Sequence, residues 1–180
     1  MERSFRNLNP NENAKRSAVM VLIINNPDPE IIFTLRSNKL RSHSGQISFP
    51  GGRVEQGESM LEAALRETKE EIGLDAAEIN VLGAMSRLYV PPSNSLIYPF
   101  VGLLNDTPEI VICEDEVEEC FSVPISHFEN KSNYAVKKEI LEGYEVDMPY
   151  WEVSKKTILW GATSMILNEL IDLYKDWKQN

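Results

Sequence analysis

The stretch over residues 58–74 predicts a helix whose beginning, end and buried side are all set by residue type. Ser59 and Glu62 have the S-x-x-E spacing of a capping box, which satisfies backbone N–H groups at the start of a helix. Apolar side chains then recur every three or four positions and form one stripe. Gly73 stands where helices commonly end in a left-handed residue. We therefore expect a helix over residues 60–72, packed on a core through this stripe.

The same helix carries three glutamates beside its apolar stripe. Glu67 and Glu71 are four residues apart and share one flank, and Glu70 borders them. Their mutual repulsion is destabilising unless a cation lies among them, and such a density of hard oxygen ligands suits Mg²⁺ or Mn²⁺. A solvated, glutamate-rich helix end would give the same pattern. Taken alone, the helix leaves both interpretations open.

Strand-like segments surround this helix. Residues 17–24 and 31–36 are apolar and β-branched, and they flank a turn rich in Asn, Pro and Asp, which predicts a hairpin. The sequence also predicts a long C-terminal helix over residues 157–177. Several strands, a central helix and a terminal helix favour an α/β (α+β) fold in one domain over residues 1–180, with 1–16 as a loose N-terminal arm. Further strands are expected over residues 79–90, 96–104 and around 120–124, and a short strand over residues 47–52 is expected to be broken by Pro50 and the two glycines.

Composition narrows the possible partners. The net charge is −10, which argues against nucleic-acid or membrane binding because both need a basic surface. A small phosphorylated ligand stays possible, since it needs only a few local cations and a metal. No apolar run reaches the length of a transmembrane span. The two cysteines and the lack of a signal peptide predict a reducing, cytoplasmic location.

Residues 52–74, GRVEQGESMLEAALRETKEEIGL, fit the pattern G-x5-E-x7-R-E-U-x-E-E-x-G-U, where U is apolar. The chain therefore resembles the Nudix hydrolases. The resemblance implies a Nudix fold, with a mixed β-sheet sandwiched between helices and a catalytic loop-helix-loop at 52–74. It also implies hydrolysis of a nucleoside diphosphate linked to another moiety. The implied metal ligands are Glu67, Glu70, Glu71 and the Gly52 carbonyl, and the residues implied to be structural in the motif are Glu58, Arg66 and Gly73.

The segment just before this motif, residues 32–52, resembles the signature of the coenzyme A pyrophosphatases within the same family. This second resemblance implies metal-dependent hydrolysis of the pyrophosphate bond of coenzyme A or acyl-CoA to 3′,5′-ADP and a 4′-phosphopantetheine product. Ile32 and Phe33 stand where the signature has leucines. The matching positions are Thr34, Arg36, Ser37, Arg41, Gly45, Phe49, Pro50, Gly51 and Gly52.

The loop within this signature holds the densest group of cations in the chain. Arg36, Lys39 and Arg41 are expected to bind substrate phosphates, in particular the 3′-phosphate of coenzyme A, because guanidinium groups suit phosphate oxygens. The alternative is that they are solvated charges or partners of the acidic helix. The general base is expected among the glutamates of the motif or at Glu116, which precedes a later strand.

Two other functions remain open at this stage. One is a Nudix hydrolase that acts on another nucleoside diphosphate derivative, such as ADP-ribose or NADH. The other is a catalytically silent ligand sensor, against which the complete set of Glu67, Glu70 and Glu71 argues. Whether the chain forms a homodimer is also open.

Overall fold

The computed structural model describes residues 10–40, 43–141, 144–153 and 157–179. A mixed β-sheet forms its centre, in the order β3-β2-β1-β7-β5, with β4 also paired to β1, β6 to β7 and β8 to β2. Its strands are β1 (Lys15–Ile24), β2 (Glu30–Arg36), β3 (Ile47–Ser48), β4 (Gly51–Arg53), β5 (Asn80–Ala84), β6 (Leu88–Val90), β7 (Ser95–Leu104) and β8 (Val117–Pro124). β1 and β7 are parallel and their neighbours antiparallel, so the sheet is mixed as expected.

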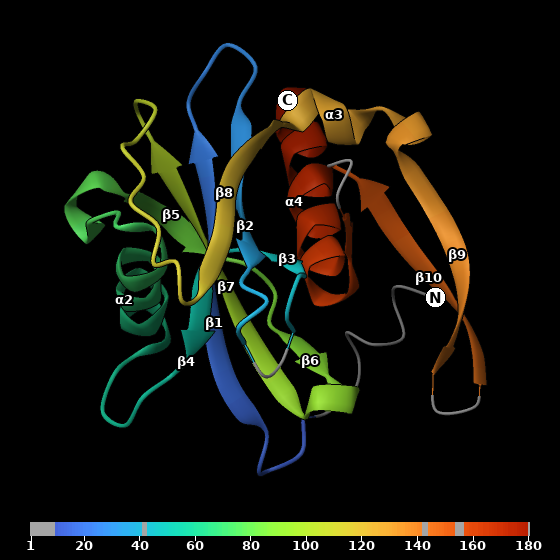
Figure 1. Cartoon of the computed structure of the whole chain (residues 1–180). Coiled ribbons are helices and arrows are strands. Elements are labelled where there is room, and N and C mark those ends of the chain that lie inside the picture. Colours follow the sequence, from blue (N-terminus) through green and yellow to red (C-terminus); the bar gives the residue numbers. More distant parts are fainter. Residues whose placement is uncertain (1–9, 41–42, 142–143, 154–156, 180) are drawn as a thin grey trace.

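Helices cover both faces of this sheet (Figure 1). Helix α2 (Met60–Ile72) lies on one face and α4 (Gly161–Gln179) on the other. Residues alternate along β1, so Met20 and Leu22 pack in the core beneath α2, whereas Val21 packs in the core beneath α4. Successive apolar residues of β1 are thus buried by different helices, α2 on one face of the sheet and α4 on the other. The arrangement confirms the expected sandwich.

A second, smaller sheet lies on the outer side of α4 (Figure 1). It consists of β9 (Tyr134–Leu141), β10 (Tyr144–Glu152) and β11 (Ile158–Trp160). Short helical segments connect the other elements: η1 (Ala76–Glu78), η2 (Pro91–Ser93), α3 (Ile125–Glu129) and η3 (Lys131–Asn133). Within the described part of the chain, none of the helices combines the length and apolar character needed to cross a bilayer.

The expected hairpin and the helix over residues 60–72 are confirmed, but two expected boundaries were wrong. The C-terminal helix begins at Gly161 and not at residue 157, because residues 158–160 pair with β10 and bury Leu159. The strand expected over 79–90 is two strands, with a register shift beside Gly83, whose φ is 155°. The break expected at Pro50 is confirmed, since Phe49 and Pro50 separate β3 from β4.

Two residues of the N-terminal arm expected over residues 1–16 belong to a strand. β1 begins at Lys15 and continues the parallel pairing with β7, from Lys15 opposite Ser95 onward. The first nine residues lie outside the described part of the chain.

Candidate active site

The loop-helix-loop over residues 52–74 has the local structure that its sequence dictates. The Ser59 side chain accepts a hydrogen bond from the Glu62 N–H, and the Glu62 carboxylate accepts one from the Ser59 N–H, which completes the capping box. At the other end Gly73 has a φ of 76° and its N–H donates to the Lys69 carbonyl. The helix therefore has fixed ends, and the orientation of its glutamates is fixed with them.

Three carboxylates meet between α2 and the loop before β8. One oxygen each of Glu67, Glu71 and Glu116 lies within 4.8 Å of the others, and we name these residues the carboxylate trio. Glu71 is only 1% exposed, so it belongs to the buried face of α2 and not merely to its border. Two of these glutamates come from the predicted helix, and Glu116, more than 40 residues further along the chain, reaches them through the pairing of β8 with β2.

Glu71 is held by two donors from other elements. The Gly51 N–H donates to its Oε2 at 3.1 Å, and Arg36 Nη1 donates to its Oε1 at 3.3 Å. Burial raises the pKa of Glu71 to about 7, with Glu67 and Glu116 adding to the shift and Gly51 and Arg36 opposing it. The two donors therefore do not fully compensate the charged Glu71 carboxylate for the loss of water and for the repulsion by its neighbouring carboxylates.

Arg66 connects the remaining glutamates of the motif. Its Nε and Nη2 donate to both oxygens of Glu58, at 3.1 and 2.8 Å, and its Nη2 also donates to the Arg53 carbonyl at 3.0 Å. Its Nη1 donates to Glu67 at 3.0 Å and to Glu70 at 2.9 Å. Hydrogen bonds from Arg66 and from the Glu55 N–H lower the pKa of Glu58. Arg66 thus joins Glu58 in the loop to Glu67 and Glu70 on the helix.

Glu67 and Glu70 differ in their surroundings. The Glu67 side chain is 15% exposed, and burial raises its pKa in spite of the opposing hydrogen bond from Arg66. The Glu70 side chain is 55% exposed, and its described contact is the pair with Arg66. The structure thus brings Glu67 and Glu71 together with Glu116, while Glu70 lies on the outer side of Arg66.

Gly52 provides the close approach of backbone to carboxylate on which such a site depends. A Cβ at Gly52 would lie 2.3 Å from Glu67 Cδ and 2.4 Å from each of its oxygens, so any side chain there would displace the carboxylate. At Gly51, where φ is 150°, a Cβ would lie 2.3 Å from the Ala18 carbonyl oxygen. The two adjacent glycines are therefore needed for different reasons, one for the site and the other for the β1–β4 pairing.

The residues present fit a divalent cation. Hard oxygen ligands converge from α2 and the loop before β8, their mutual repulsion is only partly compensated by Arg36 and Arg66, and Gly52 leaves room beside Glu67. Oxygen ligands at such spacing are those that Mg²⁺ and Mn²⁺ prefer. A bound cation would offset the repulsion and favour the charged forms of Glu67 and Glu71.

The cations of the loop after β2 are already paired where the structure describes them. Arg36 contacts Glu71, and its buried Nε has no hydrogen-bond partner among the described residues. Lys39 forms an exposed ion pair with Asp115 at 2.9 Å. Arg41 lies outside the described residues. A substrate contact by these three residues stays a prediction, and for Lys39 the alternative of a pair with the acidic segment is what the structure contains.

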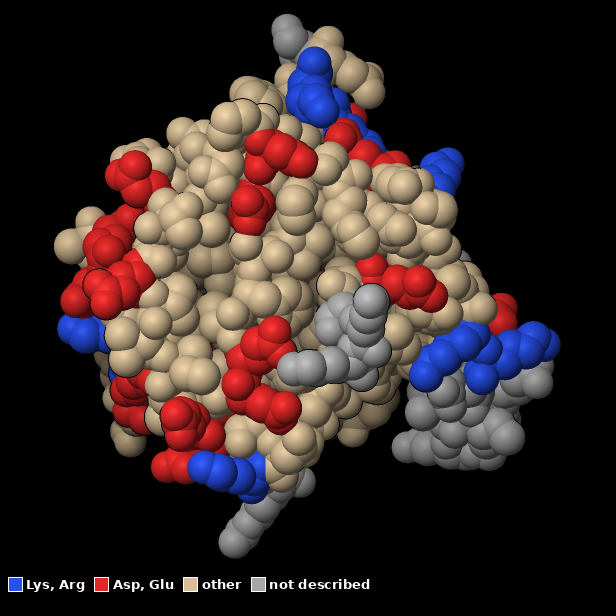
Figure 2. Space-filling view, turned by 45° about the horizontal axis from the view of Figure 1, so that its top comes forward, with Lys and Arg blue, Asp and Glu red and all other residues tan. Residues whose placement is uncertain are grey.

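Sequence reasoning missed two features of this region. The Gly51 N–H that holds Glu71 could not be read from residue types, because it depends on the bend between β3 and β4. The second feature is the closeness of Lys15 and Arg53, which are far apart in the sequence and are brought together by the pairing of β4 with β1. Figure 2 shows a face over which acidic side chains are spread, with the lysines and arginines at its edges. That face therefore offers no broad basic surface for a nucleic acid.

The fold and the carboxylate trio define a class of protein: an α/β sandwich with a capped helix that presents oxygen ligands for a divalent cation. The chain belongs to the Nudix family, since the model of the NUDIX domain matches residues 14–144. An uncharacterized Nudix hydrolase, NudL, of Yersinia enterocolitica is 33% identical over 88% of this chain and 80% of its own length. NudL of Pectobacterium atrosepticum is 32% identical over 91% and 84%. The protein is accordingly a Nudix pyrophosphohydrolase.

Solved structures agree on the fold. A MutT/nudix family protein from Enterococcus faecalis has a TM-score of 0.61 at 20% identity, over 93% of this chain and 65% of that protein. MutT protein from Methanosarcina mazei has a TM-score of 0.57 at 17% identity, over 92% and 99%. The Nudix domain of Shewanella oneidensis NrtR, which was crystallised with ADP ribose, has a TM-score of 0.52 at 16% identity, over 68% and 82%. At these identities the likeness concerns architecture alone.

Proposed function

We propose that this Nudix hydrolase cleaves the pyrophosphate bond of coenzyme A or an acyl-CoA, giving 3′,5′-ADP and a 4′-phosphopantetheine product. One observation carries the proposal. Arg36, a fixed position of the coenzyme A pyrophosphatase signature, is joined to Glu71 of the carboxylate trio. The signature over residues 32–52 and the Nudix motif over residues 52–74 thus belong to one physical site.

The reaction joins the oxygen of water to one phosphorus of the pyrophosphate and breaks the bond from that phosphorus to the bridging oxygen. The bridging oxygen leaves with the other phosphate. A divalent cation held there would lower the pKa of bound water and neutralise phosphate charge. Glu67, Glu70 and Glu71, with the Gly52 carbonyl, are the proposed ligands, and Glu116 is the proposed acceptor of the proton from water.

The protein's own residues prepare the site for this chemistry. Arg66 holds Glu67 and Glu70 on the same side of α2, and the Gly51 N–H fixes one oxygen of Glu71. Arg36 holds the other oxygen of Glu71 and places a guanidinium next to the trio, where it can pair with the reacting phosphates. Burial of Glu71 keeps bulk water away from its carboxylate, which strengthens the electrostatic interactions there.

The test is a comparison of substrates. The purified protein is incubated with coenzyme A, acetyl-CoA, ADP-ribose and NADH in the presence of Mg²⁺ or Mn²⁺, and the products are separated and identified. We expect the highest kcat/KM for coenzyme A or its thioester, with 3′,5′-ADP as a product. Faster hydrolysis of ADP-ribose or NADH would reject coenzyme A as the substrate and leave the Nudix chemistry in place. No turnover of any substrate by a metal-binding protein would favour a ligand sensor.

A further inference from the structure

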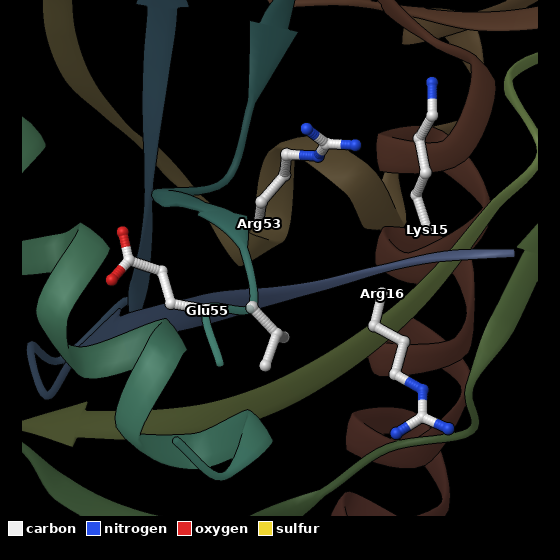
Figure 3. A pocket seen from close by; sticks show the side chains of 5 residues that line it. Lys15, Arg16, Arg53 and Glu55 are labelled. Carbon is white, nitrogen blue, oxygen red and sulfur yellow. The ribbon is translucent and has the colours of Figure 1, made fainter. Parts of the chain in front are cut away.

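A groove lies where β1 and β4 begin to pair. Its lining comes from both strands and the residues that follow β4, and it encloses about 430 Å³ (Figure 3). This volume is in the range of small-molecule sites. We call it the β1–β4 groove, and its lining residues are Lys15, Arg16, Arg53, Val54 and Glu55.

Two cations of this groove point to the same side. Ser17 pairs with Arg53 in the antiparallel register of β1 and β4, so their side chains share a face of the sheet. Lys15 is two residues from Ser17 and lies on that face as well, whereas Arg16 points to the opposite face. Figure 3 shows this directly: Lys15 and Arg53 extend upward, Arg16 downward, and the Glu55 carboxylate points away from both.

Within the described part of the chain, no carboxylate is paired with Lys15 or Arg53. Both side chains are exposed, and among the described residues neither has an ion pair within 4.0 Å or a side-chain hydrogen bond. The cations closer to the trio differ in this respect: Arg36 is joined to Glu71, Lys39 to Asp115, and Arg66 to three glutamates. In a chain of net charge −10, two neighbouring cations that face a hollow without a carboxylate partner favour an anionic ligand.

The groove also has a fixed position relative to the carboxylate trio. Arg53 directly follows Gly52, which touches Glu67, and its carbonyl accepts a hydrogen bond from Arg66. Lys15 is three residues along β1 from Ala18, the partner of Gly52, and this corresponds to roughly 10 Å along the strand. Ala18 packs in the core beneath α2, so by alternation Lys15 and Arg53 point to the opposite face of the sheet. The trio lies at the edge of β4 that does not pair with β1, where the Gly51 N–H donates to Glu71 and the Arg53 carbonyl accepts from Arg66. A ligand that crosses this edge would place its pyrophosphate at the trio and a further group near Lys15 and Arg53.

We infer that Lys15 and Arg53 bind a second phosphate group of the substrate, separate from the pyrophosphate that is cleaved. The substrate class is a nucleoside diphosphate derivative with a phosphate monoester on its sugar, which is the chemistry of the 3′-phosphate of coenzyme A. The inference rests on the proposed function for the position of the pyrophosphate. It assigns Arg36 to the reacting end of the substrate and the second phosphate to the opposite side of Gly52.

The test measures binding directly and does not depend on turnover. Adenosine 3′,5′-bisphosphate and 5′-AMP are titrated by calorimetry into wild type, Lys15→Gln, Arg53→Gln and Arg16→Gln. Arg16→Gln is the matched control, because it removes a cation of the same groove that points to the other face. Wild type should bind the bisphosphate more tightly than 5′-AMP. Loss of a charge-assisted contact should weaken bisphosphate binding roughly tenfold or more in the first two variants.

Two affinities should stay unchanged. One is the affinity of every variant for 5′-AMP, and the other is the affinity of Arg16→Gln for either ligand. Thermal unfolding would show whether each variant folds. Equal affinity of the wild type for both ligands, or equal losses in Arg16→Gln and Arg53→Gln, would overturn the inference. Bisphosphate binding that depends on Lys15 and Arg53 in a protein unable to hydrolyse coenzyme A would support the inference and reject the proposed function. Hydrolysis of coenzyme A together with unchanged bisphosphate binding in Arg53→Gln would support the proposed function and reject the inference.

Discussion

The cations on the two sides of Gly52 differ in whether carboxylates of the protein pair with them. On the side of α2, Arg36 and Arg66 are shielded from solvent, with 23% and 26% of their side chains exposed, and each is joined to carboxylates. On the side of the β1–β4 groove, Lys15 and Arg53 are exposed, and no ion pair holds them among the described residues. The first pair of cations is used by the protein to hold its own carboxylates in place. The second remains available for a ligand.

This difference has an energetic consequence. Exposed ion pairs contribute about 0–1 kcal/mol, whereas hydrogen bonds to partly buried charged groups contribute more, on the order of 1.5–3 kcal/mol. Mutations on the α2 side should therefore change stability and metal binding together. Mutations in the groove should leave stability nearly unchanged and alter ligand affinity only.

The largest effect is expected from Glu71→Gln, which removes the most buried charge of the α2 side. Turnover should fall on the order of a hundredfold or more because a proposed metal ligand is lost, while the fold stays intact. The pKa of Glu71 is about 7 in the folded protein, against an ordinary value of 4.5. The metal-free folded protein thus holds this proton more tightly than the unfolded chain, and its free energy of unfolding should fall as pH rises from about 4.5 to 7.

Glu71→Gln should remove that fall in stability, so the metal-free variant should have a higher Tm than wild type at pH 8. The rise in Tm that Mg²⁺ gives the wild type should be smaller in the variant. The matched control is Glu109→Gln, which removes an exposed carboxylate. Near-native kcat of Glu71→Gln at saturating Mg²⁺ would contradict the role of the trio.

The two adjacent glycines offer a sharper comparison. Gly51→Ala should destabilise the fold by about 2–3 kcal/mol, because its Cβ would meet the backbone of Ala18 and Val19 at a φ of 150°. Gly52→Ala should cost less stability, because its Cβ meets only the flexible end of Glu67. It should instead lower activity at least roughly tenfold through displacement of that carboxylate. Urea unfolding and kcat/KM of both variants measure the two effects.

A reversed outcome, with Gly52→Ala unstable and Gly51→Ala stable but inactive, would contradict the assignment of one glycine to the site and the other to the strand pairing. Equal loss of stability in both would show that the segment acts only as a structural bend.

Much of the α2 side could be predicted from the sequence, because its geometry is local. The capping box, the C-terminal glycine and the spacing of Glu67 and Glu71 lie within one helix, where residue number determines direction. The pairing of Arg66 with Glu58 follows from the same short segment. Fold class and the central hairpin were likewise predictable, since continuous apolar strands imply a sheet covered on both faces.

The rest depends on strand register, which residue types do not specify. The meeting of Glu116 with Glu67 and Glu71 requires β8 to pair with β2, and the position of Arg53 beside Lys15 requires the register of β4 on β1. The beginning of α4 was misplaced because Ile158–Trp160 is apolar enough to continue a helix, yet it pairs with β10. Contacts between segments far apart in the chain decided these cases.

Arg66→Ala tests whether the cation network of the α2 side holds the carboxylates in place. The variant leaves Glu67 and Glu70 without their shared partner, so we expect a loss of stability of about 1–3 kcal/mol and a Mg²⁺ requirement raised roughly ten- to hundredfold. Arg66→Lys keeps the charge but cannot reproduce the paired contacts with Glu58, and it should fall between wild type and Arg66→Ala. Thermal unfolding and activity against Mg²⁺ concentration measure both effects.

An unchanged Mg²⁺ dependence in Arg66→Ala, together with reduced stability, would restrict Arg66 to a structural role.

The smallest effect is expected from Lys39→Ala. This variant tests whether Lys39, in the loop after β2, only pairs with Asp115 or also contacts the substrate. Lys39 and Asp115 are 63% and 84% exposed, so breaking their ion pair should leave the free energy of unfolding nearly unchanged. Because this lysine is already paired, its removal should change kcat/KM for coenzyme A less than twofold, whereas loss of a direct phosphate contact costs roughly tenfold or more. The measurement compares coenzyme A with 3′-dephospho-CoA in Lys39→Ala and Arg53→Gln. A preference for coenzyme A that is lost in Lys39→Ala and kept in Arg53→Gln would place the second phosphate on the loop, as the sequence first predicted, and not in the β1–β4 groove.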